Sequence, residues 1–397
     1  MLKLRPAIVL EIDRPDTAPA DVRAPAGDGP EQTLLIELTD DNAGGPRAAI
    51  ADVALVGRAE VGDEVIVNVQ ALDLGLGSGG FDVVHVNLTR GLDGEGTDDA
   101  NVMKLNYTSL QHTVMPVDDE LLEVPLERPV AVLALHGQLA AVAWAYAQGA
   151  DGGRLGYVQT GGGALPGGHS RTVRALRERG LLAGHVTAGA AFGGEEEAIS
   201  TAGAIHHGLG TLGWDAVVCG PGPGIVGSSS ALGHGGMVAL DSAHVALALG
   251  CPTLLVARMS SSDDRTRHRG ISHHTLTVLD LLLEPVTVAL PAGMRSPVGA
   301  DLRAGLGAVF GGSMPGRPAL ALDVPRPVRI TRHDWRRAAV DLPAYATSGL
   351  STHTMGRGLP EDPLFFGAAL AGGTVLAQLN ARLHRQGALA AEAKLEE

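Results

Sequence analysis

The chain has 397 residues, a formal net charge of −14, 45% hydrophobic residues and only 3% aromatic residues. This length and hydrophobic content predict a globular protein of two or three domains, with a core made of aliphatic side chains. The strong negative charge argues against general nucleic-acid binding, because an acidic surface repels the phosphate backbone.

The cysteines and the apolar stretches indicate in which cellular compartment the protein is located. Cys219 and Cys251 lie in apolar runs, which is typical of buried thiols in a reducing compartment. The apolar run near the N-terminus is too short for a signal peptide. The most apolar stretch, residues 129–150, is interrupted by a polar segment and does not reach the length of a membrane span. We therefore expect a soluble cytoplasmic protein with no membrane partner.

Residues 1–125 are predicted to form an all-β domain. Short β-prone runs alternate there with clusters of Pro, Gly and Asp. Several short strands at regular spacing indicate a small barrel or sandwich. The runs are Ala7–Ile12, Gln32–Leu38, Ala48–Val56, Glu64–Gln70 and Val83–Asn87.

The segment Leu105–His112 is unusually polar for a strand. We interpret it as an extended segment that bridges two domains. The alternative is that Lys104, Tyr107 or His112 reaches into a cleft shared by the two domains.

Residues 126–330 are predicted to form a Rossmann-like α/β domain. Apolar runs rich in β-branched residues alternate there with helical patterns, which indicates a parallel sheet with helices on both faces. Ligands of such sheets bind at the carboxyl ends of the strands. The predicted strands are Val130–Leu135, Leu155–Gln159, His185–Ala188, Ala216–Cys219, Thr253–Ala257 and Val286–Leu290.

Two weaker elements are expected after the last of these strands, a helix over residues 301–310 and a strand over residues 319–322. Residues 331–397 are predicted to form a C-terminal helical segment that packs back on the other domains. Its main helix begins at Asp362-Pro363, a favourable cap and first turn, and runs to about His384.

Four consecutive predicted strands are followed by polar or glycine-rich loops, which should cluster at one edge of the sheet. The third loop contains three serines and His234, and the fourth is dense in arginine and histidine. The loops are residues 160–170, 189–197, 220–234 and 258–274.

The glycine-rich third loop leads into a helix. Backbone N–H groups and the helix dipole at such a turn favour an anion. The pattern matches neither the Walker motif nor a dinucleotide-binding fingerprint, and the alternative is that the glycines only permit tight turns. The residues predicted to bind the anion here are Gly222, Gly224, Gly227, Ser228 and Ser229, together with His169 of the first loop.

The fourth loop places Arg258, Arg265, Arg267 and Arg269 close together in an acidic protein. Guanidinium groups bind phosphate or carboxylate with paired hydrogen bonds, so this local positive charge predicts a small anionic ligand. The alternative is an internal set of salt bridges with Asp263 and Asp264.

The candidate catalytic residues are His234, His268, His273, Asp263 and Asp264. Histidine and carboxylate side chains at short spacing can transfer protons or ligate a divalent metal ion. Adjacent histidines at a helix start point different ways, so at most one of His273 and His274 is expected to ligate.

Two other sources of chemistry are weaker. Ser228 to Ser230 could supply a nucleophile with His234 or His169, but no GxSxG elbow is present. The acidic run Glu195–Glu197 either stabilises a helix N-terminus or supplies a base or metal ligand.

Four segments together resemble a bacterial family of uncharacterised proteins that carries a domain-of-unknown-function label. They are Leu105–His112, Gly220–Gly227, His268–Thr275 and Ser351–Arg357. The resemblance spans almost the whole chain and implies a shared fold. It supplies no activity and no catalytic residue.

The sequence therefore supports two hypotheses. The first is an enzyme that acts on a small anionic substrate, for example a phosphorylated one, by acid–base or metal-assisted chemistry. The second is a non-catalytic regulatory protein that binds a nucleotide or metabolite. Both leave a homo-oligomer open.

Overall fold

The computed structural model describes residues 1–13, 29–40, 44–75, 80–92, 94, 100–118, 121–293 and 326–395. The chain forms two compact units. The first unit, called the barrel unit below, contains Met1–Pro116 and Leu165–Arg171; the second, the α/β unit, contains Val117–Ala164 and Thr172–Glu397. The helix expected over residues 301–310 and the strand expected over residues 319–322 lie outside the described residues.

The barrel unit contains a closed barrel with strand order β1-β2-β3-β5-β4. β1 pairs antiparallel with both β2 and β4, and β3 pairs parallel with β5. Alternate side chains such as Val9, Ile36 and Val67 point into its core, as the two-residue period of a strand requires. The strands are β1 (Leu4–Ile12), β2 (Glu31–Leu38), β3 (Arg47–Asp52), β4 (Glu64–Asn68) and β5 (Asp82–Asn87).

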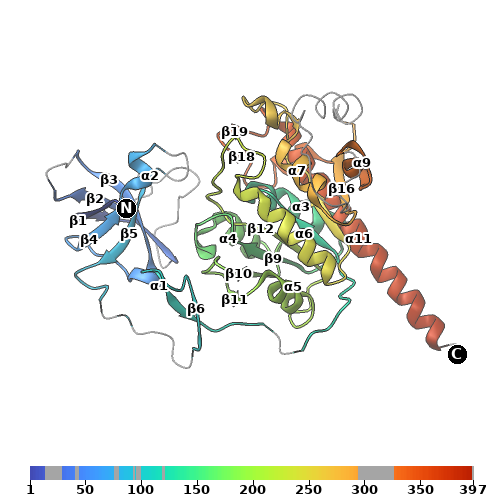
Figure 1. Cartoon of the computed structure of the whole chain (residues 1–397), viewed down its shortest axis with the longest axis horizontal. Coiled ribbons are helices and arrows are strands. Elements are labelled where there is room, and N and C mark those ends of the chain that lie inside the picture. The colour runs from blue at the N-terminus through green and yellow to red at the C-terminus, as the bar shows by residue number, and fades with distance from the viewer. Residues whose placement is uncertain are drawn as a thin grey trace, which may run out of the picture. The chain divides into compact units, whose positions relative to one another are not determined.

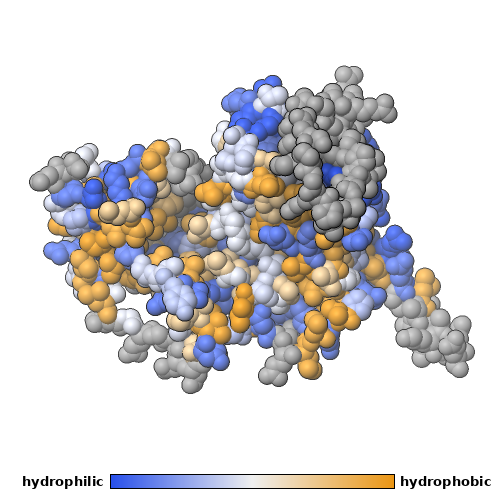
Figure 2. Space-filling view, viewed as in Figure 1, coloured by the Kyte–Doolittle hydropathy of each residue, from blue (hydrophilic) through white to orange (hydrophobic). Residues whose placement is uncertain are grey.

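The barrel also carries apolar side chains on its outside, where Figure 2 shows hydrophobic surface between polar residues. Ile8, Val61 and Leu74 are among the exposed large hydrophobic residues. The sequence predicted a barrel or a sandwich for this unit, and the closed barrel confirms the first of these.

Two details of this unit differ from expectation. The strand expected over Ala48–Val56 ends at Asp52, because the Asp52 carboxylate accepts the amide of Leu55 and caps the short helix α1 (Val53–Val56). A second short helix, α2 (Gln70–Asp73), follows β4.

The prediction of an extended segment over Leu105–His112 is wrong. These residues form the turn of a hairpin between β6 (Val102–Lys104) and β7 (His112–Val114), in which Lys104 pairs with His112. Leu105 and Tyr107 adopt left-handed backbone conformations, with φ of 52° and 62°, which end an extended strand.

The α/β unit is built on an eight-stranded sheet with order β11-β10-β9-β12-β8-β13-β16-β17, and every neighbouring pair is parallel. The predicted Rossmann-like parallel sheet is therefore confirmed. The strands are β8 (Val130–Val132), β9 (Leu155–Thr160), β10 (Gly184–Ala188), β11 (Glu196–Ala198), β12 (Ala216–Pro221), β13 (Thr253–Val256), β16 (Thr287–Pro291) and β17 (Asp334–Ala338).

Helices cover both faces of the sheet (Figure 1). Ala131 and Leu133 of the β8 region pack into one core with α3, α4 and α11, whereas Val130 and Val132 pack into a second core with α5, α6 and α7. A strand buried on both faces reads as a continuous apolar run, which explains the sequence pattern. The helices are α3 (Leu139–Gly149), α4 (Arg171–Glu178), α5 (Thr201–Leu209), α6 (Val238–Ala248), α7 (His273–Leu281), α9 (Arg326–Thr331), α10 (Leu342–Ala346) and α11 (Pro363–Leu395).

The strand order reverses around β8. From β9 the chain builds outward to β10 and β11; it then returns to place β12 beside β8, and continues on the other side with β13, β16 and β17. The loops that leave the carboxyl ends of β12 and β13 therefore start on either side of β8. A crevice at such a reversal is the usual ligand site of an open parallel sheet.

The C-terminal segment contributes to the sheet as well as to its cover. β17, with the charged sequence DWRRA, adds an edge strand that its composition did not suggest. α11 continues beyond the expected end at His384 to Leu395, because the Ala- and Glu-rich tail favours helix. Its part Pro363–Gln386 is long and apolar enough to cross a membrane, but 83% of its most apolar window is buried inside the protein. Such burial is that of a core helix.

Buried polar rings cross the first of the two cores. The His136 and Tyr157 side chains meet at 3.3 Å, and the Tyr157 hydroxyl donates to backbone carbonyls of Gly220 and Pro221. His185 stacks on Tyr157, with ring centroids 5.1 Å apart. Burial lowers the pKa of His136 to about 4 and that of His185 to about 3.

These histidines predict an acid-sensitive fold. In the unfolded chain a histidine binds a proton below a pH of about 6.5, whereas folded His185 stays neutral down to about pH 3. Stability should therefore fall as the pH falls below 6.5, by up to about 1.4 kcal/mol per pH unit for each such histidine. His185→Phe, which keeps a ring against Tyr157, should reduce this slope in urea titrations between pH 7 and pH 5. The same change at exposed His353 should not, and equal slopes for the two variants would contradict the explanation.

Candidate functional site

The polar loop that follows β13 is folded back on itself. Met259 pairs with Ile271 through the short antiparallel strands β14 (Met259–Ser260) and β15 (Gly270–Ile271). Ser272 then caps α7 by accepting the amide of His274. These contacts close the segment between them, called the Arg–His loop below (residues 258–274), over the carboxyl end of the sheet.

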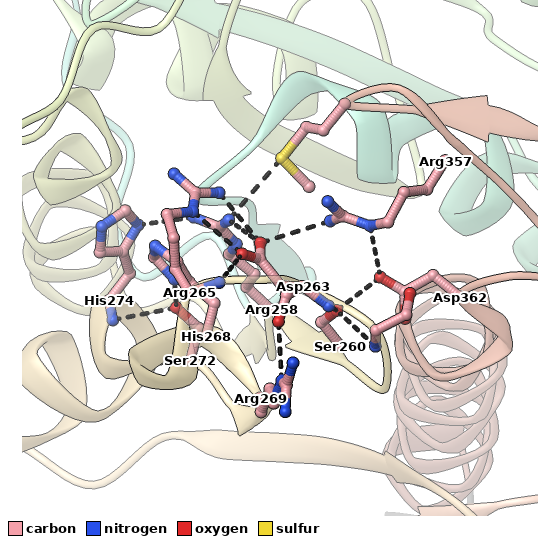
Figure 3. A network of polar contacts seen from close by, with 12 residues as sticks. Arg258, Ser260, Asp263, Arg265, His268, Arg269, Ser272, His274, Arg357 and Asp362 are labelled. Atoms are coloured by element: carbon pink, nitrogen blue, oxygen red, sulfur yellow. Dashed lines mark hydrogen bonds and ion pairs between the residues drawn. The ribbon is translucent and has the colours of Figure 1, made fainter.

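The centre of the Arg–His loop is the carboxylate of Asp263, which is 1% exposed (Figure 3). Arg265 donates two side-chain hydrogen bonds to it, each of 2.9 Å. Arg258 and Arg357 contribute weaker contacts of 3.5 Å and 3.3 Å. Burial by itself would raise the pKa of Asp263, but the hydrogen bonds from Arg265 outweigh burial and hold that pKa below its usual value. Asp263 is therefore ionised at neutral pH.

A second buried carboxylate ties the loop to the start of α11. Asp362 accepts the Ser260 hydroxyl at 2.5 Å and the Ser261 amide at 2.7 Å. Arg357, in the hairpin of β18 (His353–Thr354) and β19 (Arg357–Gly358), donates to both Asp362 and Asp263 (Figure 3). The Arg–His loop, the β18–β19 hairpin and α11 are thus held by one set of charges.

Four histidine rings lie against each other beside these charges. His234, which precedes the 3₁₀ turn Gly235–Met237, stacks on His274 with ring centroids 3.4 Å apart. His273 and His274 are 4.4 Å apart, and His268 lies 4.9 Å from each of them. The loop after β12 and the Arg–His loop therefore meet at one place.

All four imidazoles are held in the neutral form at neutral pH. Burial, assisted by the neighbouring arginines or histidines, lowers the pKa of His268 to about 3, that of His273 to about 4 and that of His274 to about 2. Burial also lowers the pKa of His234. Neutral imidazoles can accept protons or bind metal ions.

The hydrogen bonds of two rings assign their tautomers. The Nε2 atom of His234 lies 3.1 Å from the Ala231 carbonyl, so Nε2 carries the hydrogen and Nδ1 carries the lone pair. Arg258 can only donate, so its contact of 3.0 Å with Nδ1 of His274 makes that atom an acceptor. The Nδ1 atom of His268 lies 2.8 Å from the Ser272 hydroxyl.

Several buried nitrogen atoms of this cluster have no hydrogen-bond partner among the described residues. They are Nδ1 of His234, Nε2 of His273, Nε of Arg258 and Nε of Arg267. Leaving such an atom unsatisfied costs roughly 1–3 kcal/mol. Unpaired buried polar atoms that gather in one place indicate a ligand, an ion or a water molecule.

The structure brings together most of the residues predicted from sequence. His234, His268, His273, Asp263 and Arg265 share the cluster. Arg269 donates to the backbone carbonyl of Asp263, and Arg267 acts electrostatically on His273. Asp264 is exposed next to them and contributes charge near Arg265.

The glycine–serine turn is arranged differently. Gly227 pairs with His234, and Ser228 bonds to Ser230 and to Gly233 within the turn. Ser228 and Ser229 are exposed at its tip. Gly222 and Gly224 are required by the path of the backbone. A Cβ on Gly222 would meet the Gln159 amide at 2.4 Å, and Gly224 has φ of 85°.

Two other groups singled out from sequence have local partners. His169 belongs to the segment of the chain that groups with the barrel unit, where its Nε2 lies 3.0 Å from the Asp52 carboxylate. Glu195 pairs with Arg177, and Glu197 accepts from Thr187. The acidic run therefore stabilises local structure in and beside β11.

Sequence reasoning missed the contribution of the β18–β19 hairpin and of the α11 start. Asp362 was recognised only as a helix cap, and Arg357 only as part of a resembling segment. The internal salt bridges given as the alternative for the arginines are present at Asp263, which pairs with Arg258 and Arg265. The contact between Arg258 and His274 was not expected. These residues are identified only by their proximity in the folded protein, because their spacing in the sequence does not relate them.

The comparisons with known proteins identify a family whose function is unknown. A family model described as "Protein of unknown function (DUF3866)" matches residues 48–373. The comparisons with curated proteins and with solved structures found no match.

The central position of Asp263 can be tested by mutation. Asp263→Ala leaves buried Arg258 without its carboxylate, and breaking a buried ion pair costs about 3–5 kcal/mol. We expect a loss of that size in the free energy of unfolding, measured with urea. Asp264→Ala, next to it but exposed, is the matched control and should change stability by less than about 0.5 kcal/mol. Similar losses for both variants would show that Asp263 does not hold the loop.

Proposed function

We propose a function from the geometry of the site, since the chain belongs to DUF3866, a family of proteins of unknown function. In this proposal the protein is an enzyme that acts on a small anionic substrate, such as a phosphate ester, by acid–base chemistry. The substrate binds where the loop after β12 meets the Arg–His loop.

One observation carries the proposal: among the described residues, the buried Nε donors of Arg258 and Arg267 have no hydrogen-bond partner, and they lie in the same cluster as Nδ1 of His234 and Nε2 of His273, which also have none. Among the described residues, this cluster also contains more guanidinium groups than carboxylates. Asp263 is shared by Arg258, Arg265 and Arg357, and Asp362 pairs with Arg357 as well. An oxyanion would satisfy the unpaired donors and balance the charge.

Each residue then has a role that its contacts support. Arg258 and Arg267 hold the anion through their unpaired Nε donors. His234 is the proton acceptor, because its lone pair is on the unpartnered Nδ1 atom. A bound anion would raise the pKa of His234 from its depressed value towards neutrality, since a nearby negative charge favours the protonated form.

Glycine keeps the acceptor atom accessible. A Cβ on Gly236 would lie 3.1 Å from Nδ1 of His234 and 3.1 Å from the Ala134 carbonyl. A side chain at this position would therefore cover the atom to which we assign the base.

The second candidate function is a non-catalytic regulatory protein that binds a nucleotide or metabolite. It is favoured by the depressed pKa values of the cluster histidines, which leave none of these residues protonated as a general acid in the free protein. The two candidates share the same anion site and differ in turnover.

The proposed surroundings of the protein are the same for both candidate functions. The acidic charge and the buried α11 support a cytoplasmic protein that binds neither nucleic acid nor membrane. A homo-oligomer is compatible with either function.

The anion site can be tested with inorganic phosphate and a panel of phosphate esters, by calorimetry and thermal shift. A charged hydrogen bond contributes about 1.5–3 kcal/mol, so Arg267→Gln should weaken binding by roughly 10- to 150-fold. Arg336→Gln, on edge strand β17 and outside the cluster, is the matched control and should leave the affinity unchanged. Equal affinities of the two variants would refute the anion site.

A second variant tests the proposed role of His234 as the proton acceptor. His234→Gln should keep phosphate-ester affinity within about threefold but abolish turnover, because glutamine cannot take the proton. Wild-type binding without turnover of any ester in the panel would favour the regulatory candidate instead.

A further inference from the structure

We propose that His268, His273 and His274 bind one first-row transition-metal ion, with Zn²⁺ as the ion that the ligand set fits best. This inference goes beyond the proposed function and does not rest on it. It depends on the three imidazoles and not on the arginines.

The three side chains can converge on one point. One ligand nitrogen from each of them lies within 4.8 Å of the other two, and all three residues are buried. Zn–N bonds of about 2.0–2.1 Å in a tetrahedral site place the ligand nitrogens roughly 3.3 Å apart. Small side-chain rotations of about 1 Å therefore bring the set into bonding distance.

The ligand chemistry selects the class of ion. The set consists of imidazoles alone, whereas Mg²⁺ and Ca²⁺ require several oxygen ligands. Imidazole suits zinc and its neighbours in the first transition row. Three protein ligands leave a fourth position open, which is the arrangement of catalytic rather than structural zinc sites.

An outer contact already orients one of the ligand rings. The Ser272 hydroxyl is 2.8 Å from Nδ1 of His268, and such a contact on one ring nitrogen directs the other towards the metal ion. The same hydroxyl caps α7 at the His274 amide, which positions the first turn. Nε2 of His273 is buried and has no partner among the described residues.

His274 links the metal site to Arg258. Arg258 donates to Nδ1 of His274, so the hydrogen of this ring is on Nε2. Ligation through Nε2 moves the hydrogen to Nδ1 and therefore releases the Arg258 contact. The freed guanidinium can then donate to an anion, so metal binding and anion binding should favour each other.

The test uses the full-length protein, stripped with a chelator and reloaded with Zn²⁺ or Co²⁺. Bound metal is measured by mass spectrometry after gel filtration, and Co²⁺ is also followed by its visible absorption. We expect one ion per chain. His273→Ala should weaken binding by more than the roughly 10- to 100-fold that loss of an outer contact costs. His384→Ala, an exposed histidine on α11, should bind as the wild type does.

His268→Gln provides a second ligand variant in case His273→Ala fails to fold, which circular dichroism would show. Substoichiometric metal in the wild type, or equal binding by the ligand variants and His384→Ala, would overturn the proposal. Arg267→Gln separates the two proposals, because it should weaken phosphate binding and keep one metal ion. Metal loss in the histidine variants with phosphate binding retained in the stripped protein supports the metal site independently of the enzyme.

Discussion

A carboxylate without access to water must be matched by positive charge, and this requirement organises the carboxyl end of the α/β unit. An isolated ion at the depth of Asp263 costs several kcal/mol in lost hydration. Arg258 and Arg265 of the Arg–His loop and Arg357 of the β18–β19 hairpin supply the compensation. Because Arg357 comes from a separate element, the requirement draws the hairpin to the loop. Asp362 repeats the principle at the start of α11.

The same charges set the behaviour of the neighbouring histidines. Burial lowers the pKa of His268, His273 and His274, and the neighbouring guanidinium groups and imidazoles add to this effect. The result is a buried cluster of neutral imidazoles in which, among the described residues, the Nε donors of Arg258 and Arg267 have no partner. If it binds both a metal ion and an anion, as we propose, each would reduce the charge penalty of binding the other.

The fold explains why this cluster lies where it does. In a parallel sheet all carboxyl ends share one edge, and the strand order reverses on either side of β8. The loops after β12 and β13 leave the sheet on both sides of that strand, and His234 of one loop stacks on His274 of the other. The glycine–serine turn places His234, while the hydroxyl groups of Ser228 and Ser230 form hydrogen bonds within the turn itself.

The sequence by itself determined the class of fold and the loops that matter. Continuous apolar runs such as Val130–Val132, alternating with helical patterns, predict strands buried on both faces of a parallel sheet with helices on each side. Local signals also located the start of α11 and the polarity of the Arg–His loop. They did not locate β17, whose charged sequence resembles a loop, because an edge strand is decided by a partner strand and not by its own composition.

Tertiary structure alone decided which polar residues act together. Arg357 and Asp362 are about a hundred residues from Asp263 along the chain, and no periodicity relates them. The expected divergence of His273 and His274 also failed, because the capped first turn of α7 lets both rings face His268. The four-ring cluster and its unpaired nitrogen atoms arise from burial and proximity between distant loops, which a linear pattern of residues cannot encode.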